Sequence, residues 1–202
     1  DHIQGLGTFS KKFDTPIYAN QETIDNMQNQ ILKISEKNIK KFKVTDKFSI
    51  GDIDIKSFPI PHDAANPCGF NIFKENKKLS IATDIGHMDN KLIKNLEDSL
   101  FILLESNYDP EIIKYSRYPY SLKSRITGPL GHLSNDSAGK TISYLLKSGL
   151  KSAMLGHLSK ENNFPELAYK TVADELMEQN NFNNSISLSV ADRNNPSKLL
   201  EF

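Results

Sequence analysis

The chain has 202 residues, and its 25 basic and 25 acidic side chains give a formal net charge of zero. This length is enough for one domain with a full hydrophobic core. No apolar run approaches the roughly 18 residues that span a membrane, and no signal peptide is visible. A protein built mainly to coat nucleic acid would be basic overall, so any such role depends on local charge.

Cys68 is the only cysteine, so the chain forms no internal disulfide. This composition fits a reducing compartment. We therefore expect a single domain over residues 1–202, located in the cytoplasm.

Hydrophobic spacing predicts helices and strands along the whole chain. The first half is expected to contain, in order, helix 3–13, strand 15–19, helix 21–34, two strands within 47–60 around a turn at Gly51-Asp52, and a hairpin of strands 69–73 and 79–84. The second half is expected to contain helix 89–99, strand 100–105, helix 134–150, strand 151–156, helix 164–179 and strand 185–192. Strands followed by alternating helices and strands indicate the α/β class.

Four of the five histidines stand beside small or polar residues, just beyond a predicted strand or at the start of a loop: His2, His62, His132 and His157. Strand ends are where α/β proteins place reacting groups. Asp84 also ends an apolar strand, where a carboxylate is costly to bury unless it is paired. Imidazole and carboxylate are ligands that zinc accepts, so the following residues form a plausible Zn²⁺ set: Asp1, His2, His62, Asp84 and His157. A lone histidine there is more often a hydrogen-bonded structural residue, so the inference depends on the pattern.

Several segments resemble motifs of the metallo-β-lactamase superfamily. Asp1-His2 before "IQGLG" resembles the end of its His-x-His-x-Asp-His motif. "PIPHDAANPCGFNIF", "LSIATDIG" and "LGHLSKENN" resemble the segments of its third-motif histidine, its bridging aspartate and its last histidine. The order of "LLESNYD", "YPYSLKSRI", "GHLSN" and "GHLSKENN" is similar to that in the YycJ/WalJ-like (VicX) branch of bacterial proteins. The resemblance runs from residue 1 to about residue 180.

This resemblance implies a metallo-β-lactamase αββα sandwich whose first strands, with a His-x-His pair ahead of Asp1, are missing from this chain. It implies two divalent metal ions in the intact protein, Zn²⁺ or Mn²⁺. His62 would belong to the first ion, Asp1, His2 and His157 to the second, and Asp84 would bridge them. Asp1 would also orient the attacking hydroxide. The chain as given is expected to hold one ion weakly, or none.

The resemblance also implies roles for residues around the metals. His132 is expected to contact the scissile phosphate or donate a proton, with Ser134 and Asn135 as phosphate binder and cap, since a helix N-terminus favours an anion. The alternative for His132 is a residue that merely caps the helix. Lys160 and Arg125 are expected to face substrate, although a solvated lysine is the common case.

Other polar residues have weaker indications. Glu105 is expected to accept a hydrogen bond from an active-site group or to pair with Arg125, and Asp63 to support His62 or cap a loop. His87 lies three residues after Asp84 and carries a weaker indication of function.

The segment "SRYPYSLKSRI" interleaves Arg117 and Lys123 with Tyr118 and Tyr120. Basic and aromatic side chains together grip single-stranded nucleic acid without sequence preference. A loop packed by its tyrosines explains the pattern equally well.

For function, the resemblance implies a metal-dependent hydrolase that cleaves nucleic-acid phosphodiesters through a metal-activated hydroxide, working on DNA from the 5′ end. Two rivals remain open. One is a thioester or lactam hydrolase on the same fold, and the other is a non-catalytic regulatory protein that keeps the fold. No protein partner is predicted.

Overall fold

The computed structural model describes residues 2–27, 33–179 and 186–201. Within these ranges, every helix is too short or too polar to cross a membrane.

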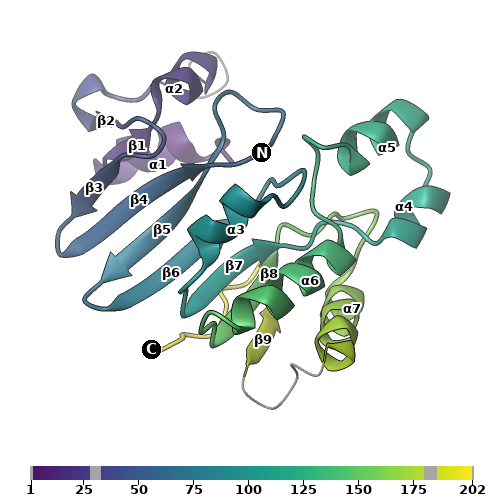
Figure 1. Cartoon of the computed structure of the whole chain (residues 1–202). Helices are drawn as coiled ribbons and strands as arrows, with labels where there is room; N and C mark the ends of the chain where they lie inside the picture. The colour runs from purple at the N-terminus through teal and green to yellow at the C-terminus, as the bar shows by residue number, and fades with distance from the viewer. Residues whose placement is uncertain (1, 28–32, 180–185, 202) are drawn as a thin grey trace.

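The fold is built on one seven-stranded mixed sheet (Figure 1). Its strands, in sheet order, are β3 (Lys47–Ile50), β4 (Ile53–Pro59), β5 (Cys68–Lys74), β6 (Lys77–Ala82), β7 (Phe101–Glu105), β8 (Ser152–Gly156) and β9 (Ser187–Val190). Strands β3 to β6 pair antiparallel, and β6 to β9 pair parallel. Because β4 is separated from β6 by two antiparallel pairings, β4 runs in the same direction as β6 and its parallel neighbours.

Three helices cover one face of this sheet: α3 (Asn90–Leu96), α6 (Asn135–Leu146) and α7 (Pro165–Glu178) (Figure 1). The main core forms where they meet the sheet. Leu104 of β7 and Leu155 of β8 are fully buried there, together with Ile142 of α6 and Leu176 of α7. This burial of apolar side chains is the main stabilising contribution to the fold.

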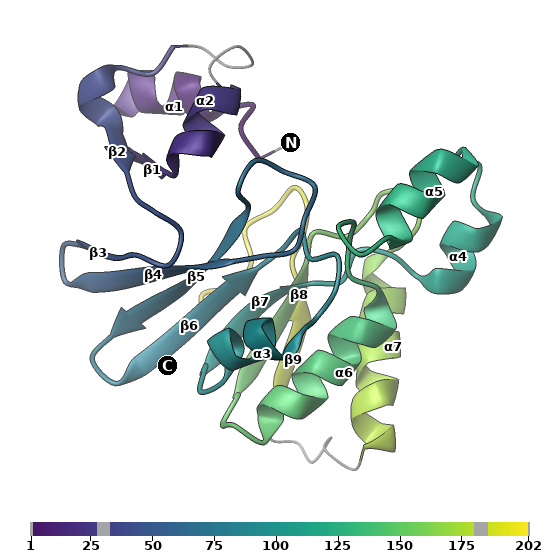
Figure 2. The ribbon, with the colours of Figure 1, turned by 45° about the horizontal axis from the view of Figure 1, so that its top comes forward.

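The N-terminal part forms a small unit of its own beside β3 and β4 (Figure 2). It consists of α1 (Leu6–Phe13), β1 (Ile17–Ala19), α2 (Gln21–Met27), a 3₁₀ turn (Glu36–Asn38) and β2 (Ile39–Lys41). Strands β1 and β2 pair parallel, and Ile24, Met27 and Ile34 form a separate hydrophobic cluster.

Two further short helices, α4 (Pro110–Tyr115) and α5 (Tyr120–Thr127), extend from the side of the molecule beyond the strand ends (Figures 1 and 2). Neither helix was predicted, because both are short and their apolar residues form only a small separate cluster. Tyr118 packs in a small cluster with Tyr108, Ile113 and Ile126, whereas Tyr120 is exposed. The alternative of a loop packed by its tyrosines is therefore wrong for Tyr120.

The predicted α/β class and the order of the main elements are confirmed. The first helix begins at Leu6 rather than at residue 3. The second is described only over Gln21–Met27, and residues 28–32 of its predicted range lie outside the described residues. Of the four-layer sandwich, the described residues supply the large mixed sheet and one helical layer, with the two-stranded sheet beside them.

Replacing Leu104 by Ala tests the main core. The side chain is fully buried between the sheet and its helices, so the truncation is expected to lower the free energy of unfolding by about 2–5 kcal/mol. Urea denaturation measures this change. As a control, Leu199→Ala removes a side chain that is 86% exposed and should change stability by less than about 0.5 kcal/mol. Equal effects of the two substitutions would contradict this assignment of the core.

Candidate metal centre

The candidate site lies at one edge of the sheet, where strands of the same direction end. Ala82 of β6 is paired with Leu104 of β7, and Glu105 of β7 is paired with Gly156 of β8. The residues that follow these strand ends, Asp84 and His157, are therefore brought beside Glu105. His62 follows β4, which runs in the same direction, so the loop after β4 delivers this imidazole to the same edge.

Two sharp turns aim side chains at the site. Asp84 and His157 each adopt a left-handed backbone conformation, with φ of 59° and 56°. Such conformations are uncommon for residues other than glycine, though Asp and His are among those that adopt them most readily. When they occur just beyond strands they often mark functional sites.

Four imidazoles surround the Asp84 carboxylate. The Nε2 atoms of His62 and His157 lie 3.4 and 3.7 Å from its Oδ1 atom, and Nδ1 of His132 lies 3.8 Å from the same atom. His2 approaches the other oxygen, with 2.9 Å between its Nε2 and Oδ2. The fold therefore brings together five residues that are distant in the chain, namely Asp84 and the four histidines. Asp1, also predicted here, lies outside the described residues.

Hydrogen bonds fix the tautomers of two of these rings. Nδ1 of His62 lies 2.8 Å from the carbonyl oxygen of Gly131, which only accepts, so Nδ1 carries the proton. Nδ1 of His157 lies 2.7 Å from the carboxylate of Glu105, and the same reasoning applies. In the neutral form of each ring, the lone pair at Nε2 then faces the acceptor oxygen of Asp84. Two facing acceptors repel unless a cation or a proton lies between them.

Glu105 holds the site together from beneath. Its side chain is fully buried at the end of β7. Oε1 accepts from Nδ1 of both His132 and His157, at 2.8 and 2.7 Å. Oε2 accepts the backbone N–H groups of Ile85 and Leu133, at 2.6 and 3.1 Å. This outcome confirms the expectation that Glu105 accepts from the site and excludes its alternative pairing with Arg125.

The charges at the site agree with this arrangement. Burial acts to raise the pKa of Asp84, but the hydrogen bond from His2 and the charges of His157, His2 and His62 outweigh it and lower the pKa below its ordinary value of 3.8. Burial likewise acts to raise the pKa of Glu105, and hydrogen bonds from His132 and His157 overcome it. Both carboxylates are therefore ionised at neutral pH.

The donor set fits a divalent cation such as zinc. Asp84, Glu105, His132 and His157 each offer a ligand atom within 4.8 Å of the others. Because four hydrogen bonds occupy both oxygens of Glu105, we assign this residue to orienting the imidazoles rather than to binding metal. Two ligands about 2.0–2.1 Å from a tetrahedral zinc lie about 3.3 Å apart, close to the 3.4 Å between His62 and Asp84.

A network of buried asparagines lies behind the site. It was not predicted, and the Asn residues in "ESNYD" and "KENN" are its only trace in the sequence. Asn107 donates to the carbonyl oxygen of His157 at 2.7 Å, which supports the left-handed turn there. Asn163 donates to the carbonyl oxygens of Ser106 and Asn107 and to Oδ1 of Asn135. These side chains satisfy backbone groups that the irregular loops leave unpaired.

This network corrects one prediction. Asn135 is fully buried, and its side chain bonds Ser106 and Asn163, so it is not placed to contact a substrate. Ser134 has the predicted capping position, since its Oγ accepts from the backbone N–H of Ser137, but it lies outside the pocket that contains the imidazoles. His87 is exposed, with Nδ1 beside the carbonyl oxygen of Pro129, and is separate from the cluster.

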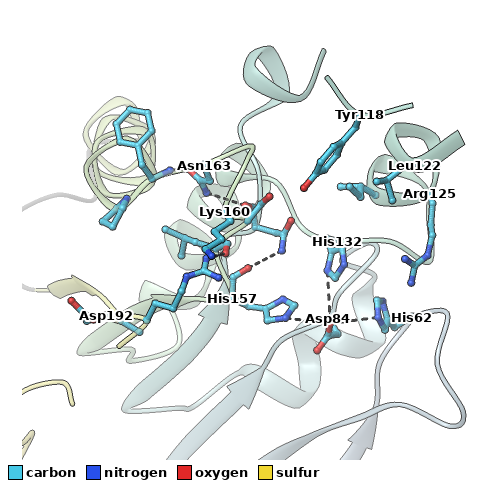
Figure 3. A pocket seen from close by; sticks show the side chains of 18 residues that line it. His62, Asp84, Tyr118, Leu122, Arg125, His132, His157, Lys160, Asn163 and Asp192 are labelled. Carbon is cyan, nitrogen blue, oxygen red and sulfur yellow. Dashed lines mark hydrogen bonds and ion pairs between the residues drawn. The ribbon is translucent and has the colours of Figure 1, made fainter. Parts of the chain in front are cut away.

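The cluster forms the floor of a pocket of about 830 Å³ (Figure 3). Arg125, Tyr118 and Lys160 line its walls, as do Phe164 and Arg193, which the sequence did not single out. The guanidinium of Arg125 forms a two-pronged ion pair with Asp63, at 2.5 and 3.0 Å. Asp63 in turn lies 3.5 Å from Nε2 of His62, so Arg125 is anchored at the edge of the cluster.

Comparisons with known proteins agree with this geometry. The chain is 36% identical over 179 residues to "Exodeoxyribonuclease YycJ" of Bacillus anthracis, covering 89% of this chain and 68% of that protein. It is 36% identical over 178 residues to "Exodeoxyribonuclease WalJ" of Streptococcus pneumoniae, covering 87% and 66%. It thus spans about two thirds of the length of these relatives.

The fold itself matches solved structures. The metallo-beta-lactamase fold protein YhfI from Bacillus subtilis superposes with a TM-score of 0.63 at 16% identity, over 94% of this chain and 70% of that one. Residues 1–158 match the family described as the beta-lactamase superfamily domain. With this match and with relatives at 36% identity, the chain belongs to the metallo-β-lactamase branch of the beta-lactamase superfamily.

Proposed function

We propose that this chain carries the metal-holding part of a bacterial, cytoplasmic exodeoxyribonuclease that depends on divalent metal ions. The observation that carries the proposal is the set of imidazole nitrogens whose lone pairs face the ionised Asp84 carboxylate. The names of the two relatives supply the substrate class, since both are called exodeoxyribonucleases. The proposal treats residues 1–202 as one domain.

His2, His62, His157 and Asp84 are the proposed metal ligands within the described residues, and Asp1 is proposed beside them. Asp84 presents Oδ1 to His62 and His157 and Oδ2 to His2, so both of its oxygens face imidazoles that would hold metal. This arrangement groups His157 with His62, whereas the resemblance to the family groups it with His2. Bound Zn²⁺ or Mn²⁺ would supply Lewis acidity, activating water at neutral pH and offsetting charge on a phosphoryl oxygen.

The remaining residues bind and orient the substrate. His132 is held through Nδ1 by Glu105, which leaves its Nε2 to deliver a proton to the leaving oxygen. Arg125 and Lys160 line opposite parts of the pocket and are proposed to contact phosphate oxygens, with Arg125 oriented by its ion pair to Asp63. Asp63 keeps this guanidinium at the pocket edge.

The same pocket weighs against the rivals. Three basic side chains, Arg125, Lys160 and Arg193, line this pocket against Asp84 and Asp192, and this charge favours a phosphate-bearing substrate over a neutral thioester or lactam bond. A non-catalytic protein would have no requirement for imidazoles whose Nε2 atoms converge on a carboxylate.

Hydrolysis of labelled DNA tests the proposal. Strands labelled at the 5′ or the 3′ end are incubated with the full-length protein and Mn²⁺ or Zn²⁺, and the products are separated by length. Early release of labelled mononucleotide from the 5′-labelled strand is expected. Cleavage of a thioester or lactam by this protein without cleavage of DNA would refute the nuclease assignment.

Asp84→Asn removes the charge at the centre of the cluster but keeps the size and the tolerance for a left-handed turn. We expect the affinity for Zn²⁺, measured by isothermal titration calorimetry, to fall by more than about 100-fold, because loss of an outer group alone costs about 10- to 100-fold. The control is His87→Ala, which removes an exposed imidazole outside the cluster and should leave the affinity unchanged. Unaltered zinc binding by Asp84→Asn would refute the ligand assignment.

Glu105→Gln tests the orienting carboxylate. Both oxygens of Glu105 accept two hydrogen bonds each. Glutamine keeps one accepting oxygen, but its NH₂ group only donates, so two of the four N–H donors lose their acceptor. Zinc affinity is expected to fall by about 10- to 100-fold. Glu97→Gln, at a glutamate that accepts from Tyr144 away from the site, is the matched control. If both variants bind zinc equally well, Glu105 has no orienting role.

The stabilisation of the protein by Zn²⁺ is expected to increase with pH. Burial acts to lower the pKa of His157, but the hydrogen bond to Glu105 and the charges of Asp84 and Glu105 raise it above its ordinary value of 6.5. In the metal-free chain, this contribution to stability is full below pH 6.5 and is lost as pH rises through the raised value. Metal binding needs the neutral ring, so the increase in melting temperature caused by Zn²⁺ should grow over the same interval. A zinc-induced shift that is constant from about pH 6 to 8 would contradict this linkage.

A further inference from the structure

The α4–α5 arm, defined as residues 110–127, is a surface element with its own small core. Ile113 and Ile126 are buried against Tyr108, with Tyr118 and Leu122 packed beside them. The arm extends beyond the strand ends in both views (Figures 1 and 2). Its ion pair between Arg125 and Asp63 ties it to the loop that carries His62.

Positive charge is concentrated on this arm although the whole chain is neutral. Its 18 residues contain four basic side chains, Lys114, Arg117, Lys123 and Arg125, and one acidic side chain, Glu111. Glu111 lies 3.6 Å from Lys114 as an exposed pair. A local excess of positive charge of this kind attracts a polyanion even when the net charge of the protein is zero.

The arm also exposes aromatic rings. Tyr115 is 76% and Tyr120 is 85% exposed, and Nζ of Lys114 lies 5.1 Å from the centre of the Tyr115 ring. Exposed rings beside cations form stacking platforms for unpaired bases, because every base has a π face.

Tyr118 connects the arm to the metal centre. It lines the pocket that contains His62, Asp84, His132 and His157, and Figure 3 shows its ring above the imidazoles. It also lines a second hollow of about 610 Å³, whose wall includes Tyr115 and Arg117. The two hollows therefore share Tyr118 in their walls, and together they are called the track.

We propose that this track binds the nucleic-acid strand beyond the bond that is cleaved. Bases stack on Tyr118 and Tyr115, and Arg117 and Lys114 lie beside the phosphates. The inference rests on the proposed nuclease function, which it deepens by naming the surface that holds an unpaired strand. Glu111 and Glu161 also line the second hollow, and their negative charges oppose the strand there.

The test measures binding of a fluorescent single-stranded DNA by anisotropy, in EDTA so that no hydrolysis occurs, over a range of salt concentrations. Tyr115→Ala and Arg117→Gln are each expected to weaken binding by about 10-fold. Arg117→Gln should also make the dependence of log affinity on log salt shallower by about 0.7. Tyr115→Phe, which keeps the ring, should bind normally, and Glu161→Gln should bind more tightly.

The matched control removes exposed cations from another surface. Lys40→Gln and Lys41→Gln lie in β2 of the N-terminal unit and should leave binding unchanged. Equal loss in these controls and in the arm variants would overturn the proposal. So would equal binding of poly-glutamate, which carries charge without bases.

The inference about the arm and the nuclease assignment can be refuted independently of each other. If the chain cleaves DNA while the arm variants bind normally, the arm inference is wrong and the nuclease assignment stands. If Tyr115→Ala and Arg117→Gln abolish DNA binding but the full-length protein cleaves no DNA with any divalent metal, the arm inference stands and the nuclease assignment fails.

Discussion

The carboxylate of Glu105 is the constraint on which the rest of the site depends. It is fully buried, and it remains ionised because four N–H donors surround it. Those donors come from three segments that are far apart in sequence: the loop after β6, the loop before α6 and the turn after β8. A single side chain at the end of β7 therefore fixes the positions of all three relative to one another. Loss of any one donor would leave part of a buried charge unsatisfied, which is costly.

From this constraint the chemistry of the site follows. Because Glu105 accepts a hydrogen bond from Nδ1 of His157, the Nε2 atom of that ring faces Asp84. The carbonyl oxygen of Gly131 accepts from Nδ1 of His62 in the same way, so Nε2 of His62 also faces Asp84. The backbone reaches these positions through left-handed turns at Asp84 and His157, and Asn107 holds the second of them through the carbonyl oxygen. Orientation of the rings is thus built into the fold before any ion binds.

Much of this could be predicted from sequence, and the physical reason differs from residue to residue. Asp84 and His157 follow apolar strands, and strands of the same direction end at the same edge of a sheet, so their convergence follows from the pattern. His62 was predictable through the resemblance to a known family. Helices α4 and α5 were missed because their apolar residues pack only in a small satellite cluster. The role assigned to Asn135 was wrong because a polar residue after a glycine-histidine pair gives no sign of whether it faces inward or outward.

The central claim is that these imidazoles and Asp84 hold a divalent cation. Crystals of the chain grown with Zn²⁺, with diffraction measured on both sides of the zinc absorption edge, test this claim most directly. The account predicts an anomalous peak about 2.0–2.2 Å from an Asp84 oxygen and from Nε2 of His62 or His157, with Nδ1 of His157 still bonded to Glu105 and Nδ1 of His62 to the carbonyl oxygen of Gly131. A site without a peak, in which these nitrogens donate directly to Asp84, would contradict it.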